Sequence, residues 1–291
     1  ISLASVHRKN FSPEYYNECV EKSAEIPIRT LEDIEKDIDR TFPDHEFFNS
    51  NEGEGQQKLK RVLEAYAAHN PDVGYCQGIN FIAGVLLLYM AEEDAFWLFV
   101  TALDTLLPVD YFSAGLVGHH VDQAVLAHFV KDCFPALSEK LEKNYIQIPV
   151  VTVGWIMPIF INTLRHDVAL RVLDVFFAEG SKVLFKIALA LFRLNEQSLL
   201  ASKDQSELFM RLKDLGKGIV DGDVLMAAAY SNFQSRPTPR SSGLHGRKLS
   251  PTSFVALTES VGLSPRNRSS SSSSSGSTSG RSSVGGGSPR A

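Results

Sequence analysis

Helical periodicity runs through most of this 291-residue chain and constrains its fold more than any other feature. From about residue 30 to residue 230, apolar side chains recur at spacings of three and four, the pattern of helices with one buried face. In the clearest stretch, residues 56–70, Leu59, Val62 and Leu63 share one face, and Asn70-Pro71 stops the helix. No strong strand alternation or Asn-Gly hairpin signal interrupts these stretches. We therefore predict an all-α fold, a multi-helix array with short connections.

The helix before that stretch carries Ile34 and Ile38 on its apolar stripe. Thr30, followed by Asp33, predicts an N-cap, and Pro43 predicts where the helix ends. The same spacing predicts eight further helices, over residues 79–90, 94–106, 121–144, 150–164, 168–178, 182–200, 206–215 and 221–229.

Charge and composition divide the chain near residue 230. Residues 231–291 hold 8 Lys+Arg and 1 Asp+Glu, a net charge of +7. The whole-chain charge of -5 therefore leaves -12 for residues 1–230, the body of the chain. Of these 61 residues, 20 are serine, and a segment of this composition cannot bury enough apolar surface to offset the entropy of ordering it. We predict a globular domain over residues 1–230 and a disordered tail over residues 231–291. The acidic body argues against nucleic-acid binding.

Two short motifs carry residue types suited to phosphate chemistry. In Ile34-x-x-Asp37-x-x-Arg40, the carboxylate lies three residues before the arginine, close enough on a helix to hold the guanidinium in one orientation. The second motif is Tyr75-x-Gln77-Gly78-x-Asn80, whose glutamine amide can donate to one group and accept from another, and so can align a water molecule. Each motif alone has an ordinary explanation, a surface ion pair worth under about 1 kcal/mol or a helix-entry turn.

Together and in this order, the two motifs resemble the arginine-finger and glutamine-finger segments of TBC-domain proteins, the family that activates Rab-type GTPases. The resemblance extends over about residues 11–215. It includes Asn70-Pro71-x-x-Gly74, Ala95-Phe96-Trp97, Pro108-x-Asp110-Tyr111, Val121-Asp122-Gln123, the Trp155 segment and the stretch from Arg171 to Gly180. Two features depart from the family pattern. The family's domain opens with an Arg-x-x-x-Trp segment that would fall before residue 1, so we expect the chain to begin inside the domain. Leu173 stands where the family usually has a tryptophan, and we expect position 173 to be a repacked core position.

The resemblance implies a GTPase-activating protein that supplies two side chains in trans to a GTP-bound Rab-family GTPase. Arg40 would stabilise charge on the phosphoryl oxygens, and Gln77 would orient the attacking water. Asp37 would orient Arg40, while Asn80 would brace the glutamine loop or contact the partner. The supporting or partner-binding positions are Ile34, Asp37, Tyr75, Gly78 and Asn80.

The chain lacks a Gly-x-x-x-x-Gly-Lys-Ser/Thr loop, so GTP and Mg²⁺ are expected on the partner, with no cofactor or metal of its own. It would thus be an enzyme activator without independent catalytic activity. The expected setting is cytoplasmic, in vesicle trafficking and intracellular transport, with peripheral contact to endomembranes left open. The alternative is a helical scaffold or effector that binds GTP-loaded Rab without accelerating hydrolysis. The sequence does not specify which Rab.

Three other features favour structural interpretations. Cys76, at the start of a predicted helix where a thiolate would be favoured, suggests a thiol hydrolase, but no local signature accompanies it. His119-His120-x-Asp122, with His128, has no metal-binding spacing, and a solvated helix start is expected. Residues 146–164 are uncharged and long enough to span a bilayer, but two prolines favour a buried, kinked helix.

Overall fold

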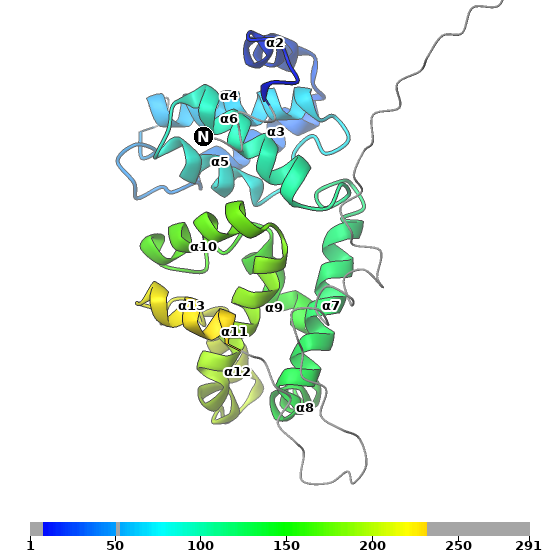
Figure 1. The fold of residues 1–291 in the computed structure, drawn as a ribbon, viewed down its shortest axis with the longest axis vertical. Helices are drawn as coiled ribbons and strands as arrows, with labels where there is room; N and C mark the ends of the chain where they lie inside the picture. Colours follow the sequence, from blue (N-terminus) through cyan, green and yellow to red (C-terminus); the bar gives the residue numbers. More distant parts are fainter. Residues whose placement is uncertain (1–7, 51–52, 232–291) are drawn as a thin grey trace, which may run out of the picture.

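The all-α prediction is confirmed in the computed structural model, which describes residues 8–50 and 53–231. Within these ranges the chain forms twelve α-helices and no β-strand. The helices form two lobes stacked along the long axis of the molecule (Figure 1). The predicted disordered tail lies, apart from Ser231, outside the described residues.

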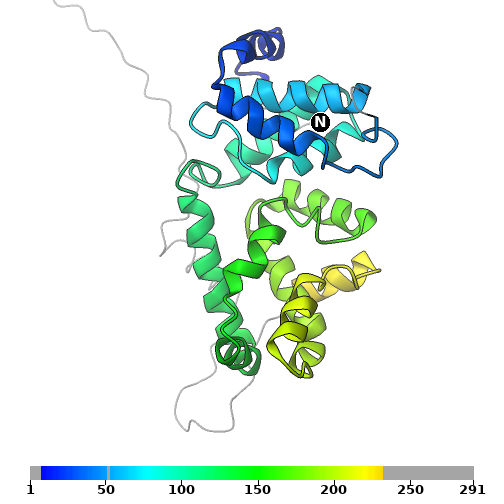
Figure 2. The same cartoon turned by 180° about the vertical axis from the view of Figure 1, so that it is seen from behind.

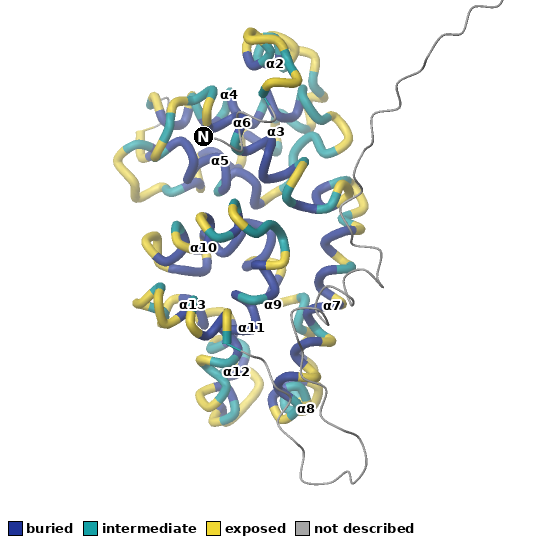
Figure 3. The backbone as a smooth tube through the Cα atoms, viewed as in Figure 1, coloured by how far each residue is buried: buried dark blue, intermediate teal, exposed yellow. Residues whose placement is uncertain are grey.

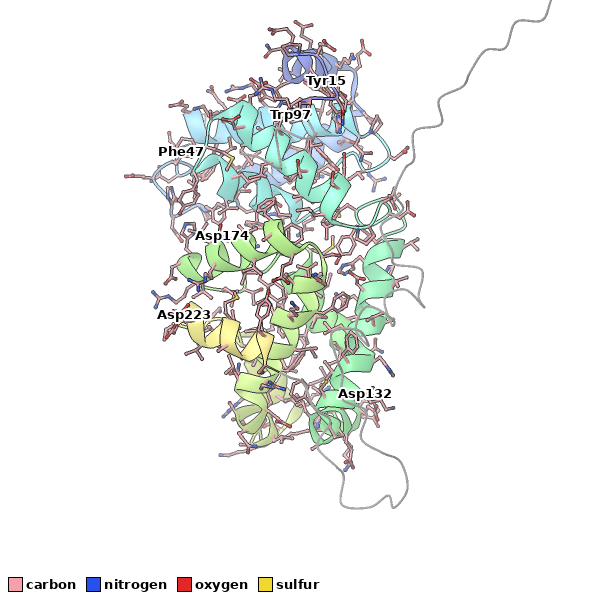
Figure 4. The ribbon with its side chains drawn as sticks, viewed as in Figure 1. Tyr15, Phe47, Trp97, Asp132, Asp174 and Asp223 are labelled. Carbon is pink, nitrogen blue, oxygen red and sulfur yellow. The ribbon has the colours of Figure 1, made fainter. Side chains whose placement is uncertain are left out.

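The N-terminal lobe is built around α4. Its elements are α2 (Tyr15–Lys22), the 3₁₀ turn η1 (Ser23–Glu25), α3 (Ile28–Ile38), α4 (Glu54–His69), α5 (Ile79–Leu87), α6 (Glu92–Val100) and the π-helical η2 (Thr101–Leu106). Helix α4 contacts α2, α3, α5 and α6, and its predicted apolar residues Leu59, Val62 and Leu63 are buried. Figure 2 shows α3 crossing in front of α4. Figure 4 labels Tyr15 and Trp97 in this lobe, and their ring centroids lie 5.8 Å apart.

The C-terminal lobe is built around α11. Its helices are α7 (Val117–Cys133), α8 (Pro135–Lys143), α9 (Ile148–Ile156), α10 (His166–Glu179), α11 (Lys182–Leu200), α12 (Gln205–Lys213) and α13 (Gly222–Tyr230). Helix α11 is long, apolar over its first half, and contacts α7, α8, α9, α10, α12 and α13. The buried stretches coloured in Figure 3 run through both lobes. Leu173, the residue in place of the family tryptophan, is buried in α10, as expected of a core position.

Several predicted helix boundaries were wrong. Helix α3 begins at Ile28 after Pro27, so Thr30 lies in its first turn and is not the N-cap. The backbone amide of Thr30 donates to the carbonyl of Pro27 at 2.9 Å. The helix also ends at Ile38, well before Pro43, and this early end places Arg40 in a turn. Helix α2 was not predicted at all.

Proline divided two stretches that were predicted as single helices. The stretch 121–144 is split into α7 and α8 at Phe134, the residue before Pro135, because proline disfavours helical geometry in the residue that precedes it. The stretch 150–164 begins as α9 but leaves the helix at Ile156, just before Met157-Pro158. Ile159 and Phe160 then adopt positive φ angles of 50° and 62°, and both are fully buried. In the part of the chain that the structure describes, no helix is long and apolar enough to cross a membrane.

The lobes touch beside the predicted glutamine loop. A Cβ added to Gly78 would lie 3.4 Å from Cβ of Met157, which follows α9 in the C-terminal lobe. At another point, the Tyr89 hydroxyl and Nε2 of His166 are 2.6 Å apart, and their rings are stacked. The loop that carries Gln77 is therefore in contact with both lobes.

Candidate functional site

The arginine motif gains its geometry from the end of α3. Ile34, Asp37 and Ile38 are spaced along one helix face, and all three are buried against the core. Arg40 follows in the turn, which the Thr41 amide closes by donating to the Ile38 carbonyl at 3.1 Å. The Arg40 guanidinium forms an ion pair with Oδ1 of Asp37. The arginine side chain is 49% exposed and the aspartate side chain is 2% exposed, so a buried anchor holds an accessible cation.

The glutamine motif lies in the loop between α4 and α5. At the start of this loop, the Asn70 carbonyl accepts hydrogen bonds from the amides of Val73 and Gly74, and Gly74 has a φ of 57°. This turn directs Tyr75 toward α3, where its hydroxyl donates to Oδ2 of Asp37 at 2.5 Å. Burial, together with that carboxylate, raises the pKa of Tyr75 well above its usual value. Asp37 therefore contacts residues from both motifs.

The next residues of this loop differ sharply in exposure. Gln77 is exposed, whereas Gly78 and Asn80 are buried. The Gly78 amide donates to Oδ1 of Asn80 at 3.0 Å, and Gly78 adopts a φ of 110°, a conformation that favours glycine. A fixed backbone thus carries the exposed Gln77 side chain.

Ile34 and Asn80 cannot contact a partner directly, because each has an exposed fraction of 0%. Ile34 belongs to the core under α3. Asn80 donates from Nδ2 to the Thr41 hydroxyl at 2.8 Å, so of its two expected roles it has the bracing one. Tyr75 and Gly78 are each fixed by a hydrogen bond within the protein, to Asp37 and to Asn80 respectively.

Thr41 was missed by the sequence reasoning. It is fully buried, and its hydroxyl donates to the backbone carbonyl of Asp37 at 2.6 Å while accepting from Asn80. The only sequence signal was its position directly after Arg40. Threonine hydroxyls often bond the carbonyl four residues earlier, so the type of residue alone did not single it out.

Cys76 is poorly suited to be a nucleophile. Burial, and then the negative charge of Asp37, raises the pKa of its thiol to about 11. A helix start was expected to favour the thiolate, but the low-dielectric surroundings and the nearby carboxylate have the opposite effect. The thiol-hydrolase interpretation therefore loses its physical basis.

The histidine group was wrongly expected to be solvated throughout. His119 and Asp122 are each 2% exposed near the start of α7. Burial, with a contribution from His120, lowers the pKa of His119 to about 4. Burial raises the pKa of Asp122 to about 7, opposed by the nearby phenol of Tyr111. Across the described residues no group of three or more His, Cys, Asp or Glu side chains is placed to hold a metal ion.

The polar groups around His119 and Asp122 are incompletely paired. Thr152 of α9 donates to Oε1 of Gln123 at 2.5 Å, and the Gln123 amide lies 3.2 Å from Nε2 of His119. Three buried atoms have no hydrogen-bond partner within the described part of the chain: the Tyr111 hydroxyl, Nδ1 of His119 and Oδ2 of Asp122. This second buried cluster contains none of the residues of the two motifs.

The fold and this site define a helical domain that presents an anchored arginine beside a braced glutamine loop. A sequence model of the Rab-GTPase-TBC domain family matches residues 4–200. The chain belongs to this family.

Known structures agree with this assignment. The Chlamydomonas flagellar RabGAP TBC domain superposes with a TM-score of 0.70 and 31% identity, covering 78% of this chain and 75% of that chain. The Ypt/Rab-GAP domain of Gyp1p superposes with a TM-score of 0.64 over 78% of each chain, and at 19% identity it supports the fold alone.

Full-length relatives are much longer than this chain. TBC1 domain family member 2B of Mus musculus is 33% identical over 230 residues, which cover 79% of this chain and 24% of the relative. Small G protein signaling modulator 3 of Bos taurus is 36% identical over 225 residues, 77% of this chain and 30% of the relative. The chain thus spans less than a third of the length of either relative.

Proposed function

We propose that this chain accelerates GTP hydrolysis by a Rab-family GTPase, and that it does so by supplying Arg40 and Gln77 in trans. The observation that carries the proposal is the double engagement of Asp37. One carboxylate oxygen binds Arg40, and the other accepts from Tyr75, two residues before Gln77. Membership of the Rab-GTPase-TBC family supports the same class of partner.

Arg40 suits the electrostatic part of this reaction. Charge on the transferred phosphoryl group is redistributed over its oxygens in the transition state, and a planar guanidinium remains charged and offers several donors to them. Asp37 holds this group in place beforehand, so less orientational freedom remains to be lost in the complex. GTP and Mg²⁺ would be carried by the partner.

Gln77 suits the orientation of water. Its carboxamide can accept a hydrogen bond from the attacking water and donate one to the partner or to a phosphate oxygen. The bond between the Gly78 amide and Asn80 fixes the backbone next to it. The chain acts in this proposal as an enzyme activator in vesicle trafficking, at the cytoplasmic face of endomembranes where such GTPases work.

A single-turnover assay over a panel of GTP-loaded Rabs tests the proposal. Wild-type protein should accelerate hydrolysis by at least one Rab, and Arg40→Ala should remove roughly 10³-fold or more of that acceleration. Gln77→Ala should remove roughly 10²-fold, the scale of one lost hydrogen bond to the reacting groups.

Matched controls come from the C-terminal lobe. Arg211 is also a partly exposed arginine paired with a carboxylate of its own helix, Glu207, and Gln197 is an exposed glutamine of α11. Arg211→Ala and Gln197→Ala should retain the wild-type rate. Binding of GTP-loaded Rab without any acceleration would favour the scaffold alternative instead.

A further inference from the structure

The turn that bears Arg40 and the loop that bears Gln77 are joined at two points. The first is the Asp37–Tyr75 hydrogen bond, which precedes Gln77 in the loop. The second follows Gln77 and passes through Thr41, whose hydroxyl accepts from Nδ2 of Asn80 at 2.8 Å and donates to the Asp37 carbonyl at 2.6 Å. Both connections lead back to the same residue of α3, one to its side chain and one to its backbone.

The second connection reaches the backbone immediately after Gln77. Oδ1 of Asn80 accepts from the Gly78 amide, while the other end of the same carboxamide donates to Thr41. If the Thr41 hydroxyl were removed, Nδ2 of Asn80 would be left buried with one partner fewer, which favours rotation of the carboxamide. Rotation would release the Gly78 amide and, with it, the backbone that positions Gln77.

Another threonine shows what is distinctive about Thr41. Thr101 is 2% exposed, and its hydroxyl donates to the carbonyl of Trp97, four residues earlier, at 2.8 Å. Thr41 makes the same local bond to Asp37. Thr41 differs in that its hydroxyl also accepts from a residue 39 positions away.

We propose that Thr41 is a positioning residue that couples the two motifs, so that Arg40 and Gln77 are held as one unit. The structural coupling stands independently of the activity, whereas its catalytic consequence rests on the proposed function. Thr41 touches no reacting atom and acts only through the Asn80 carboxamide and the turn after α3.

Residue-resolved amide hydrogen exchange tests the coupling without a GTPase. Thr41→Val keeps the side-chain volume and removes the hydroxyl, and we expect the Gly78 amide to exchange about tenfold faster, the size of one lost hydrogen bond. Thr41→Ser retains the hydroxyl and should keep the wild-type exchange rate at Gly78. Thr101→Val, the matched control, should leave Gly78 unchanged.

Three exchange results would overturn the coupling: no change at Gly78 in Thr41→Val, an equal increase in Thr101→Val, or an increase in Thr41→Ser. If the valine variant fails to fold, Thr41→Ala removes the same hydroxyl and gives the same test at Gly78.

Single-turnover kinetics test the catalytic consequence. With a responsive Rab, Thr41→Val should lower the maximal rate about tenfold and leave the half-saturating protein concentration within twofold, since no partner contact is lost. Thr41→Ser should restore the rate. A full maximal rate in Thr41→Val would show that the link does not serve catalysis. If wild-type protein accelerates no Rab, the proposed function fails, and the exchange result at Gly78 still decides the coupling.

Discussion

Two clusters that contain buried polar side chains differ in how completely their polar groups are paired. At the end of α3, the polar groups of one cluster are joined by hydrogen bonds and an ion pair. This α3 cluster consists of Asp37, Arg40, Thr41, Tyr75 and Asn80. Near the start of α7, a second group leaves three buried atoms unpaired among the described residues; this α7 cluster consists of Tyr111, His119, Asp122, Gln123 and Thr152.

The contrast separates two uses of a buried carboxylate. Asp37 is matched by a guanidinium and a phenol, and it holds side chains that lead to the surface. For Asp122, burial instead raises the pKa to about 7. Burying an unpaired charge is costly, so burial favours the neutral form of the Asp122 carboxyl group. Only the first arrangement holds a partly exposed cation in place.

The largest expected difference between the two clusters is in the single-turnover rate after the buried aspartate of each is replaced by alanine. Asp37→Ala should release Arg40 and Tyr75 together and lower the single-turnover rate roughly 10²-fold, the cost of misplaced catalytic groups. Asp122→Ala, the same substitution at an equally buried aspartate, should leave the rate within about twofold. Equal losses of rate in the two variants would mean that Asp37 contributes only to general stability.

The next largest expected effect is on the pH dependence of the unfolding free energy, to which Asp122 and His119 of the α7 cluster contribute. Because the folded-state pKa of Asp122 is raised from 3.8 to about 7, its contribution to stability falls as pH rises from 4 to 7. The pKa of His119 is lowered from 6.5 to about 4, so its contribution rises between pH 4 and 6.5, and the two effects oppose each other. In Asp122→Asn only the contribution of His119, which rises with pH, should remain.

We therefore expect the unfolding free energy of Asp122→Asn, relative to wild type, to increase by about 3 kcal/mol between pH 4 and 7. Urea unfolding at a series of pH values measures it. A pH-independent difference would show that Asp122 titrates alike in the folded and unfolded states.

Removing one phenolic hydroxyl from each cluster should lower stability by different amounts. Tyr75→Phe deletes a hydrogen bond to a carboxylate and should destabilise the protein by about 1–2 kcal/mol in chemical denaturation. Tyr111→Phe deletes a buried hydroxyl that makes no close hydrogen bond among the described residues and only lowers the pKa of the nearby Asp122 carboxyl, so it should cost less than about 1 kcal/mol. A large loss of stability in Tyr111→Phe would contradict the difference drawn between the clusters.

The last comparison, with an expected effect no larger than that of Tyr75→Phe, concerns the glycine of the loop that bears Gln77. Gly78→Ala places a side chain at a φ of 110°, beside Met157, and should cost about 1–2 kcal/mol of stability. Gly154 on α9 has open space where an added Cβ would lie and an ordinary helical setting, so Gly154→Ala should stabilise by up to about 1 kcal/mol. Thermal melts of both variants test this, and a stabilised Gly78→Ala would remove the argument for a constrained loop.

Local sequence rules predicted the contacts within each motif but not how the two motifs are joined. The three-residue spacing of Asp37 and Arg40 was enough to predict their ion pair, because residues three apart stay close even though Arg40 follows the end of α3. The apolar periodicity of residues 56–70 likewise predicted which face of α4 is buried, because that face is set by the spacing of residues within the helix itself. In both cases the relevant partners are close in sequence.

The missed features depend on contacts between distant segments. Thr41 matters through Asn80, 39 residues away, and Gly78 approaches Met157 from the other lobe. The positive φ angles of Ile159 and Phe160 follow Pro158, which signals the end of α9 but not the backbone conformation after it. Tertiary packing overrides local preference at these positions, so periodicity could not reveal them.

Affinity for a transition-state analogue tests the central claim most directly. With a Rab that responds in the single-turnover panel, wild-type protein should bind the form loaded with GDP and aluminium fluoride, and Arg40→Ala should bind it roughly 10²-fold more weakly, with little change toward the GDP form. Equal affinity of wild type and Arg40→Ala for the aluminium-fluoride form would contradict the assignment of Arg40 as the catalytic arginine.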